Sequence, residues 1–279
     1  MPVLASLGHE VVALPRRRDK GLGWNPLTGD VDLASMDGAD AVIHLAGAGI
    51  ADSRWSESRK RLIAESRSGP TTALSKFLAA CAKPPQSLIV ASAIGIYGDR
   101  GDAWLDESAV PGDGFLAGVV RDWEAATTPA IDGGIRVVNL RFGIILTPEG
   151  GALKRMLLPF KLGLGGPIGN GRQYWSWVGL NDVIGAIRHA LETNTLAGPV
   201  NVVSPNPVSN REFTKVLGNV LSRPAILPLP RFAARLALGE MAEELLLYSA
   251  RVRPTMLTAT GYQFFDTDLD SCLRRLLKS

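Results

Sequence analysis

Residues 40–91 read DAVIHLAGAGIADSRWSESRKRLIAESRSGPTTALSKFLAACAKPPQSLIVA, and this stretch decides the fold. It begins with a short apolar run, Asp40–Leu45, which has the length and composition of a buried strand. Apolar residues at helical spacing follow over Ser56–Cys81 until a pair of prolines ends the pattern. A second apolar run, Ser87–Ala91, completes the unit. A strand, a long helix and another strand in this order predict a parallel pair joined by a crossover helix.

The same alternation continues on both sides of this stretch. Glu10–Leu14 (EVVAL) has the composition of an earlier buried strand, and Arg136–Leu140 (RVVNL) has that of a later one. Short apolar strands that alternate with helices predict a doubly wound α/β fold, in which helices cover both faces of a parallel sheet. Further elements are expected as helices at Phe115–Ala126, Ala152–Leu162, Asn181–Glu192 and from Ser209 onward, and as a strand at Val200–Val203.

A cluster of prolines marks a boundary between two parts of the chain. Pro224, Pro228 and Pro230 lie close together and predict a linker. Residues 1–227 are therefore expected to form the α/β domain. Residues 228–279 are expected to form a small, mostly helical C-terminal region.

The usual phosphate clasp of a doubly wound sheet is missing near the start of the chain. That clasp is a glycine-rich turn between the first strand and the first helix. Here Met1–Leu7 followed by Gly8 has the pattern of the last turns of that helix, with Gly8 ending it. The first strand and its glycine loop are therefore expected to be absent. Glycine spacings elsewhere, such as Gly163-x-x-Gly166-x-x-Gly169, lack the strand–turn–helix context.

Composition excludes several classes of protein. The 279 residues are 46% hydrophobic and 20% charged, which is enough to bury a core, and the net charge of +3 makes a nucleic-acid partner unexpected. Cys81 and Cys272 lack neighbours at ligand spacing, so neither a disulfide framework nor a metal site is expected. No run is long enough to span a membrane and no signal peptide is evident. We expect a cytoplasmic protein that acts on a small molecule; a homo-oligomer is compatible with the sequence.

Several motifs resemble those of one protein family. They resemble the atypical short-chain dehydrogenase/reductase group called "epimerase family protein", which is related to NAD-dependent epimerases and dehydratases. The resemblance covers essentially the whole chain, and residues 228–277 are similar to the C-terminal domain of unknown function of that group. The motifs are HLAGAGI (44–50), RWSESRKRLIAESR (54–67), SAIGIYG (92–98), PGDGFLAGVVRDWEAA (111–126), LRFGIIL (140–146), GGALKRMLLPFKLGLGGPIGNGRQYWSWV (150–178), PNPVSNREFTKVL (205–217) and LGEMAEELLLYSARVRP (238–254).

This resemblance implies a Rossmann-like fold that binds NADP. Members normally begin with a central strand and a TGATGFIG-like loop, so Glu10–Leu14 would lack the neighbour that satisfies its backbone groups. Arg16 and Arg17 follow that predicted strand, where arginines favour the 2′-phosphate of NADP over NAD, which is the alternative cofactor. The other cofactor-binding candidates carried over by position are Ala46 and Gly47 beside the nucleotide, Arg67 in the helix facing it, Ser92 at the nicotinamide, and Gly143 and Ile144 near the carboxamide.

The catalytic residues of the resembled family are not all present. At the positions where members of that family carry the catalytic tyrosine and lysine, this chain has Leu116 and Val120, which cannot exchange a proton. Ser92 and Tyr97 are the replacement candidates for catalysis. Three interpretations follow: an NADP-dependent oxidoreductase or epimerase with a non-standard proton relay, a non-catalytic NADP-binding sensor, or an N-terminally truncated chain with impaired cofactor binding.

The glycine-rich segment around residues 163–178 supplies the substrate candidates. Arg172 and Gln173 suit an anionic substrate, because a planar guanidinium pairs with a carboxylate or phosphate through two hydrogen bonds. Trp175 could line the substrate site with its aromatic ring, and packing in the core is the alternative role with equal weight. The sequence therefore predicts a small, anionic substrate without identifying it.

Overall fold

The centre of the fold is a four-stranded parallel sheet. The computed structural model of the chain describes residues 2–14 and 36–278. Its sheet consists of β1 (Ala41–His44), β2 (Ser87–Ala93), β4 (Arg136–Phe142) and β8 (Gly198–Val202), in the order β1-β2-β4-β8. Each neighbouring pair is parallel, with Ile43 beside Ile89 and Ile89 beside Val138. The predicted doubly wound α/β fold is confirmed.

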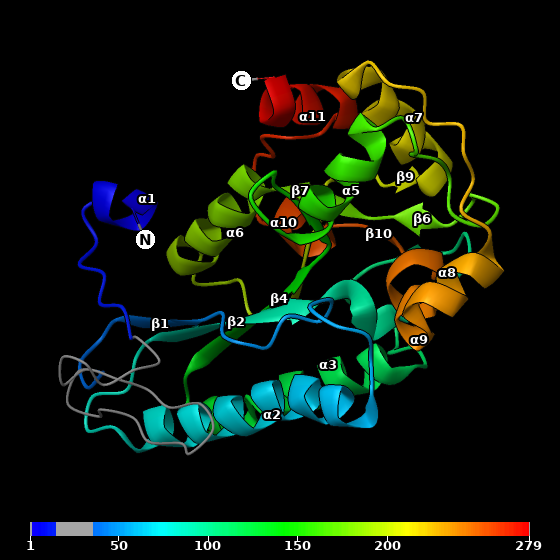
Figure 1. Cartoon of the computed structure of the whole chain (residues 1–279). Helices are drawn as coiled ribbons and strands as arrows, with labels where there is room; N and C mark the ends of the chain where they lie inside the picture. Colours follow the sequence, from blue (N-terminus) through cyan, green and yellow to red (C-terminus); the bar gives the residue numbers. More distant parts are fainter. Residues whose placement is uncertain (1, 15–35, 279) are drawn as a thin grey trace.

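Helices cover both faces of this sheet (Figure 1). In the view shown, α2 (Glu57–Ala80) and α3 (Phe115–Ala125) lie below it, and α5 (Gly151–Lys161) and α6 (Leu180–Glu192) lie above it. The remaining elements of this part are α1 (Pro2–Ser6), a 3₁₀ helix (Ile94–Tyr97), β3 (Trp104–Leu105), α4 (Thr128–Asp132), β5 (Ile144–Leu146), β6 (Tyr174–Trp175), β7 (Trp177–Gly179), β9 (Val208–Ser209) and α7 (Asn210–Leu221).

The alternation of side chains along the strands builds two separate cores. On β2, Leu88 and Val90 join the apolar cluster that contains Leu78 of α2, whereas Ile89 joins the cluster that contains Ile187 of α6. Successive residues of a strand point to opposite faces of a sheet, so a strand covered on both faces is apolar throughout. This explains why SLIVA reads as a continuous apolar run.

One predicted strand is wrong. Residues 10–14 form no strand, although the N-terminal helix α1 is present and ends as expected at Gly8, which has φ +88°. Within the described residues β1 pairs only with β2, so no strand lies beside residues 10–14. Without a neighbour, their backbone N–H and C=O groups have no ladder to join. Leu14 instead packs against the cluster on the α2 face.

The C-terminal region is mostly helical, as expected, and is attached closely to the α/β part. Its elements are α8 (Arg231–Leu238), α9 (Glu240–Ala242), a π-helix (Glu243–Leu247), β10 (Arg251–Val252), α10 (Thr255–Ala259) and α11 (Leu269–Lys278). β10 pairs with β3, and the buried carboxylate of Asp182 in α6 accepts hydrogen bonds from the backbone N–H groups of Phe265 and Asp266 at 2.7 and 2.8 Å. These contacts fix the region beside the carboxyl ends of the sheet strands.

Within residues 2–14 and 36–278, no helix is both long and apolar enough to cross a membrane. The same residues contain no group of three or more His, Cys, Asp or Glu side chains placed to hold a metal ion.

Candidate functional site

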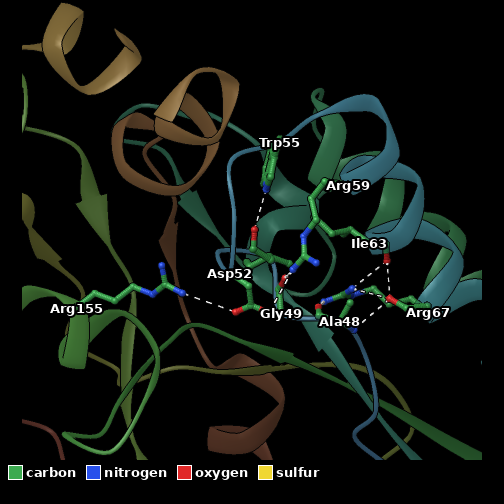
Figure 2. A network of polar contacts seen from close by, with 10 residues as sticks. Ala48, Gly49, Asp52, Trp55, Arg59, Ile63, Arg67 and Arg155 are labelled. Atoms are coloured by element: carbon green, nitrogen blue, oxygen red, sulfur yellow. Dashed lines mark hydrogen bonds and ion pairs between the residues drawn. The ribbon is translucent and has the colours of Figure 1, made fainter. Parts of the chain in front are cut away.

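The loop that follows β1 is held by arginines of α2, at the carboxyl ends of the strands (Figure 2). Ligands of doubly wound sheets bind at these ends. Arg67 donates from Nη2 to the Ala48 carbonyl at 2.9 Å and from Nη1 to the Ile63 carbonyl at 2.9 Å. A Cβ on Gly47 would lie 3.4 Å from Arg67 Cζ, which is an ordinary van der Waals contact, so the loop lies against the guanidinium without requiring glycine at this position. Burial, reinforced by the charge of Arg59, lowers the pKa of Arg67.

A second arginine on the same face of α2 binds the next residues of the loop. Arg59 donates to the Gly49 carbonyl and, at 3.2 Å, to the Asp52 carboxylate. Its Nε atom is buried without a hydrogen-bond partner. Arg155 of α5 contacts the same carboxylate from the opposite side at 3.6 Å. Three arginines therefore lie around one loop, and Asp52 is the only acidic residue in the described ranges with which any of them is ion-paired.

The two catalytic candidates lie in a buried polar network. Ser92 Oγ donates to Glu124 Oε1 at 2.6 Å, and Arg141 binds both oxygens of that carboxylate at 2.8 Å. Arg141 also donates to Tyr97 Oη at 3.0 Å, and Tyr97 donates in turn to Asn201 Oδ1 at 2.7 Å. This arrangement fixes both hydroxyl groups by neighbouring side chains.

The environment of Tyr97 opposes a role as proton carrier. Its side chain is fully buried. Burial raises the pKa of the Tyr97 hydroxyl, and the nearby Arg141 guanidinium offsets this only in part. Tyr97 thus has a cation beside its hydroxyl, yet the pKa of this hydroxyl is raised and not lowered. Leu116 and Val120 are also buried. Neither side chain can exchange a proton, because both are aliphatic.

The remaining cofactor candidates are found at the strand ends or outside the described residues. Ala46 and Gly47 follow β1, and Gly143 follows β4. A Cβ on Gly143 would come within 2.4 Å of the Ser176 carbonyl oxygen, and Ile144 N–H donates to that oxygen at 2.8 Å. The protein's own packing therefore requires glycine at this position. Arg16 and Arg17 lie outside the described residues.

The structure places two of the three substrate candidates, Arg172 and Gln173, at one cavity and the third, Trp175, in the core. Arg172 is exposed and lines a cavity of about 180 Å³ together with Asp99 and Asp102. Gln173 also borders this cavity, but its amide is buried and donates to the Ile168 and Leu246 carbonyls at 3.0 and 2.9 Å.

Trp175 belongs to the core. It is buried, and its ring centroid lies 5.2 Å from that of Phe213 in an edge-to-face arrangement. The core-packing alternative therefore describes its position.

A second cavity, of about 450 Å³, is lined by Asp99, Arg100, Pro111, Gly112, Asp113 and Tyr248.

The sequence predicted Arg67 as a site residue, but it did not predict Arg59, Arg155 or Arg141, which also belong to the site. Arg59 and Arg67 are eight residues apart, which places them on one face of a helix, and this spacing could have indicated that they act together. No sequence signal connects Arg155 with Asp52, or Arg141 with Glu124, because each pair comes from separate elements.

The fold and the site together define a nucleotide-binding class, in which small residues and arginines stand at the carboxyl ends of a parallel sheet. The chain belongs to the NAD dependent epimerase/dehydratase family, whose model matches residues 1–203. A second model, a domain of unknown function (DUF1731), matches residues 229–276. The resemblance inferred from the motifs is confirmed.

Individual relatives match over nearly the full length of the chain. Epimerase family protein Mb2239 of Mycobacterium bovis is 42% identical over 273 residues, covering 97% of this chain and 90% of the relative. The solved structure of human epimerase family protein SDR39U1 (isoform 2) with NADPH has 35% identity and a TM-score of 0.91, covering 99% and 94% of the two chains. A nucleoside-diphosphate sugar epimerase structure from Corynebacterium glutamicum has 37% identity and a TM-score of 0.79, covering 97% of this chain and 53% of that one.

Proposed function

We propose that this chain is an NADP-dependent oxidoreductase of the epimerase family that acts on a small anionic substrate. The observation that carries the proposal is the match to human SDR39U1, whose structure contains NADPH. At 35% identity and a TM-score of 0.91 over 99% of this chain, the two chains share the same fold. NAD is the alternative cofactor, since the matching family is described as NAD dependent.

The residues at these strand ends fit the nicotinamide nucleotide. Ala46 and Gly47 are small enough to let a ligand approach the backbone after β1, and Ser92 occupies the end of β2. The buried, unpartnered Nε of Arg59 is a spare hydrogen-bond donor beside the same loop. Arg67 adds a positive charge that suits a phosphate. Bound NADPH would supply the hydride, because that chemistry belongs to the cofactor.

The proton chemistry in this proposal depends on Ser92 and Glu124. Ser92 is at the end of β2 and donates a hydrogen bond to Glu124 Oε1 at 2.6 Å, so it is the residue that would orient a substrate oxygen. Tyr97 acts at a distance, since its hydroxyl helps to hold Arg141, which holds Glu124. The relay therefore differs from the tyrosine–lysine pair of the wider family.

A non-catalytic NADPH sensor is the second candidate. It is favoured by one observation: both oxygens of Glu124 accept hydrogen bonds from Arg141, so the carboxylate has little capacity left to bind a substrate. In this case the nucleotide would bind without being oxidised. The two candidates share the binding site and differ only in turnover.

The binding site is tested by titrating the purified chain with NADPH and NADH while nucleotide fluorescence is followed. We expect tighter binding of NADPH, and Arg67→Met should weaken it by about tenfold, since a charge-assisted contact is lost. Arg274→Met removes an exposed arginine of α11 and serves as the control. Failure of the folded wild-type chain to bind either nucleotide would refute the proposal.

Turnover is tested with a panel of anionic carbonyl compounds. The oxidoreductase proposal is supported if the wild-type chain oxidises bound NADPH and the Ser92→Ala variant does not, while both bind the nucleotide with the same affinity. Tyr97→Phe should change stability more than nucleotide affinity. Bound NADPH that is never oxidised by any compound would favour the sensor.

A further inference from the structure

A band of large apolar side chains is exposed on α5, on the linker before α8 and on α8 itself. We call this band the α5–α8 apolar surface. The relative exposure of its members ranges from 39% to 77%. Apolar side chains gathered in this way mark interaction sites, whereas single exposed ones do not. The members are Leu158, Leu162, Leu164, Ile226, Leu227, Leu229, Phe232 and Leu236.

Backbone contacts hold the members of this surface together. The turn after α5 is packed against the linker, since Leu227 N–H donates to the Gly165 carbonyl at 3.1 Å and Leu229 N–H donates to the Pro167 carbonyl at 2.9 Å. The approach is so close that a Cβ on Gly166 would lie 1.7 Å from the Leu227 carbonyl oxygen. The linker then leads directly into α8. The exposed leucines of α5 and the apolar residues of α8 therefore belong to one region.

This region borders the arginine loop at the carboxyl ends of the strands. Leu158 of α5 and Leu162, the residue that caps α5, follow Arg155 by three and seven residues, so all three lie on one side of this helix. On the other side, Arg54 Nη1 donates to the Leu236 carbonyl at 3.4 Å. Arg54 and Asp52 belong to the same loop, and Asp52 contacts Arg155 (Figure 2). The contacts thus run from α5 through the linker and α8 back to the loop.

Among the described residues, four cations around the apolar surface are uncompensated, whereas Arg231 and Arg235 of α8 are paired with Glu243. Lys154 and Lys161 of α5, Arg223 of the linker and Arg54 are exposed, and none has an acidic partner within 4 Å among the residues of 2–14 and 36–278. A second copy of the chain, docked face to face, would bring two such positive borders together, and like charges oppose this contact. The chemistry of the surface instead suits a ligand with an apolar body and a negative head.

We propose that the α5–α8 apolar surface binds the chain of an amphipathic anion, such as a single-chain alkyl carboxylate or phosphate. The head group replaces the Asp52 carboxylate at Arg155 and Arg59. The Asp52 and Arg155 side chains are 62% and 58% exposed, so their ion pair contributes little stability. Displacing Asp52 also breaks its 3.2 Å contact with Arg59, which is only 16% exposed, and the head group takes over that contact. This inference rests on the proposed function in one respect: the amphiphile is the substrate brought to the nicotinamide site.

The test uses the full chain and alkyl phosphates of eight, ten and twelve carbons, below their micelle concentrations, with binding measured by isothermal titration calorimetry. Affinity should rise by up to about fourfold for each added methylene that is buried. Phe232→Ser should weaken dodecyl phosphate by about tenfold, through loss of apolar contact. Ile131→Ser, which changes an exposed residue of α4, is the matched control and should leave the affinity unchanged.

The head-group site is tested with two further variants and a neutral ligand. Arg155→Gln should abolish the preference for dodecyl phosphate over dodecanol, and Asp52→Asn should strengthen binding of the phosphate. Equal affinity for dodecanol and dodecyl phosphate in the wild-type chain would overturn the proposal. An affinity that does not depend on Phe232 would also overturn it.

Other occupants of the surface give distinct results. Sedimentation with anionic vesicles without binding of monomeric amphiphile would show a lipid surface as the ligand and overturn the proposal. Dimerisation that is abolished by Phe232→Ser, without amphiphile binding, would show that a second copy of the chain occupies the surface and would overturn the proposal. NADPH affinity is measured in parallel. A chain that binds the amphiphile but not NADPH refutes only the cofactor proposal. The reverse result refutes only this inference.

Discussion

The substitution Arg141→Met is expected to destabilise the protein strongly. Arg141 and Glu124 form an ion pair whose side chains are only 7% and 14% exposed, with both carboxylate oxygens bound at 2.8 Å. Burial alone would lower the pKa of Arg141, but the hydrogen bonds and charge of Glu124 outweigh this and raise it. Methionine fills similar volume but leaves Glu124 with Ser92 as its remaining side-chain partner.

The magnitude follows from the cost of an unpaired buried charge. Removing one partner of a buried ion pair costs about 3–5 kcal/mol, so we expect a loss of about 4 kcal/mol. With a denaturant dependence of about 3 kcal/mol per M, the urea midpoint should fall by roughly 1.3 M. Tryptophan fluorescence and far-ultraviolet circular dichroism should report the same transition, which validates the two-state comparison.

A double variant separates the charge from the packing. Adding Glu124→Gln to Arg141→Met removes the unpaired carboxylate, so the double variant should be more stable than Arg141→Met alone. A midpoint shift below about 0.3 M for the single variant would refute the reasoning, since it would correspond to only about 1 kcal/mol. A double variant that loses the sum of both single effects would refute it as well.

Three further predictions concern His44, Glu244 and Phe213. Burial lowers the pKa of His44 from 6.5 to about 4. Between these two pH values only the unfolded chain takes up the proton, so the free energy of unfolding should be highest above pH 6.5 and should fall by about 3 kcal/mol as the pH drops towards 4. His44→Gln should remove this dependence in urea titrations at pH 7, 6 and 5, and parallel losses in both proteins would assign it to another group. Glu244→Gln should cost about 1–2 kcal/mol, because the carboxylate accepts the Phe115 and Leu116 N–H groups at the start of α3, each at 2.7 Å; an unchanged melting temperature would contradict this. Phe213→Ala should cost about 3–5 kcal/mol by leaving a cavity in the core, and a loss below about 1 kcal/mol in chemical denaturation would mean that the site collapses around it.

The sequence by itself determined the order and type of the main elements. The apolar runs at 40–45, 87–91 and 136–140 correspond to β1, β2 and β4, and the helical spacing of 56–81 corresponds to α2. These features are local, because a strand buried on both faces must be apolar along its length and a helix must repeat every 3.6 residues. The motifs were also sufficient to identify the family.

Only the tertiary structure decided which residues act together. Residues 10–14 have the composition of a strand but no partner beside them in the described chain, and strand formation depends on a partner. Tyr97 follows a sheet strand, where a functional hydroxyl was expected, but packing encloses it and raises its pKa. Arg155 and Asp52 are about a hundred residues apart and meet only because α5 lies near the loop after β1. Contacts of this kind depend on how elements are packed in three dimensions, and the periodicity of any single segment carries no record of them.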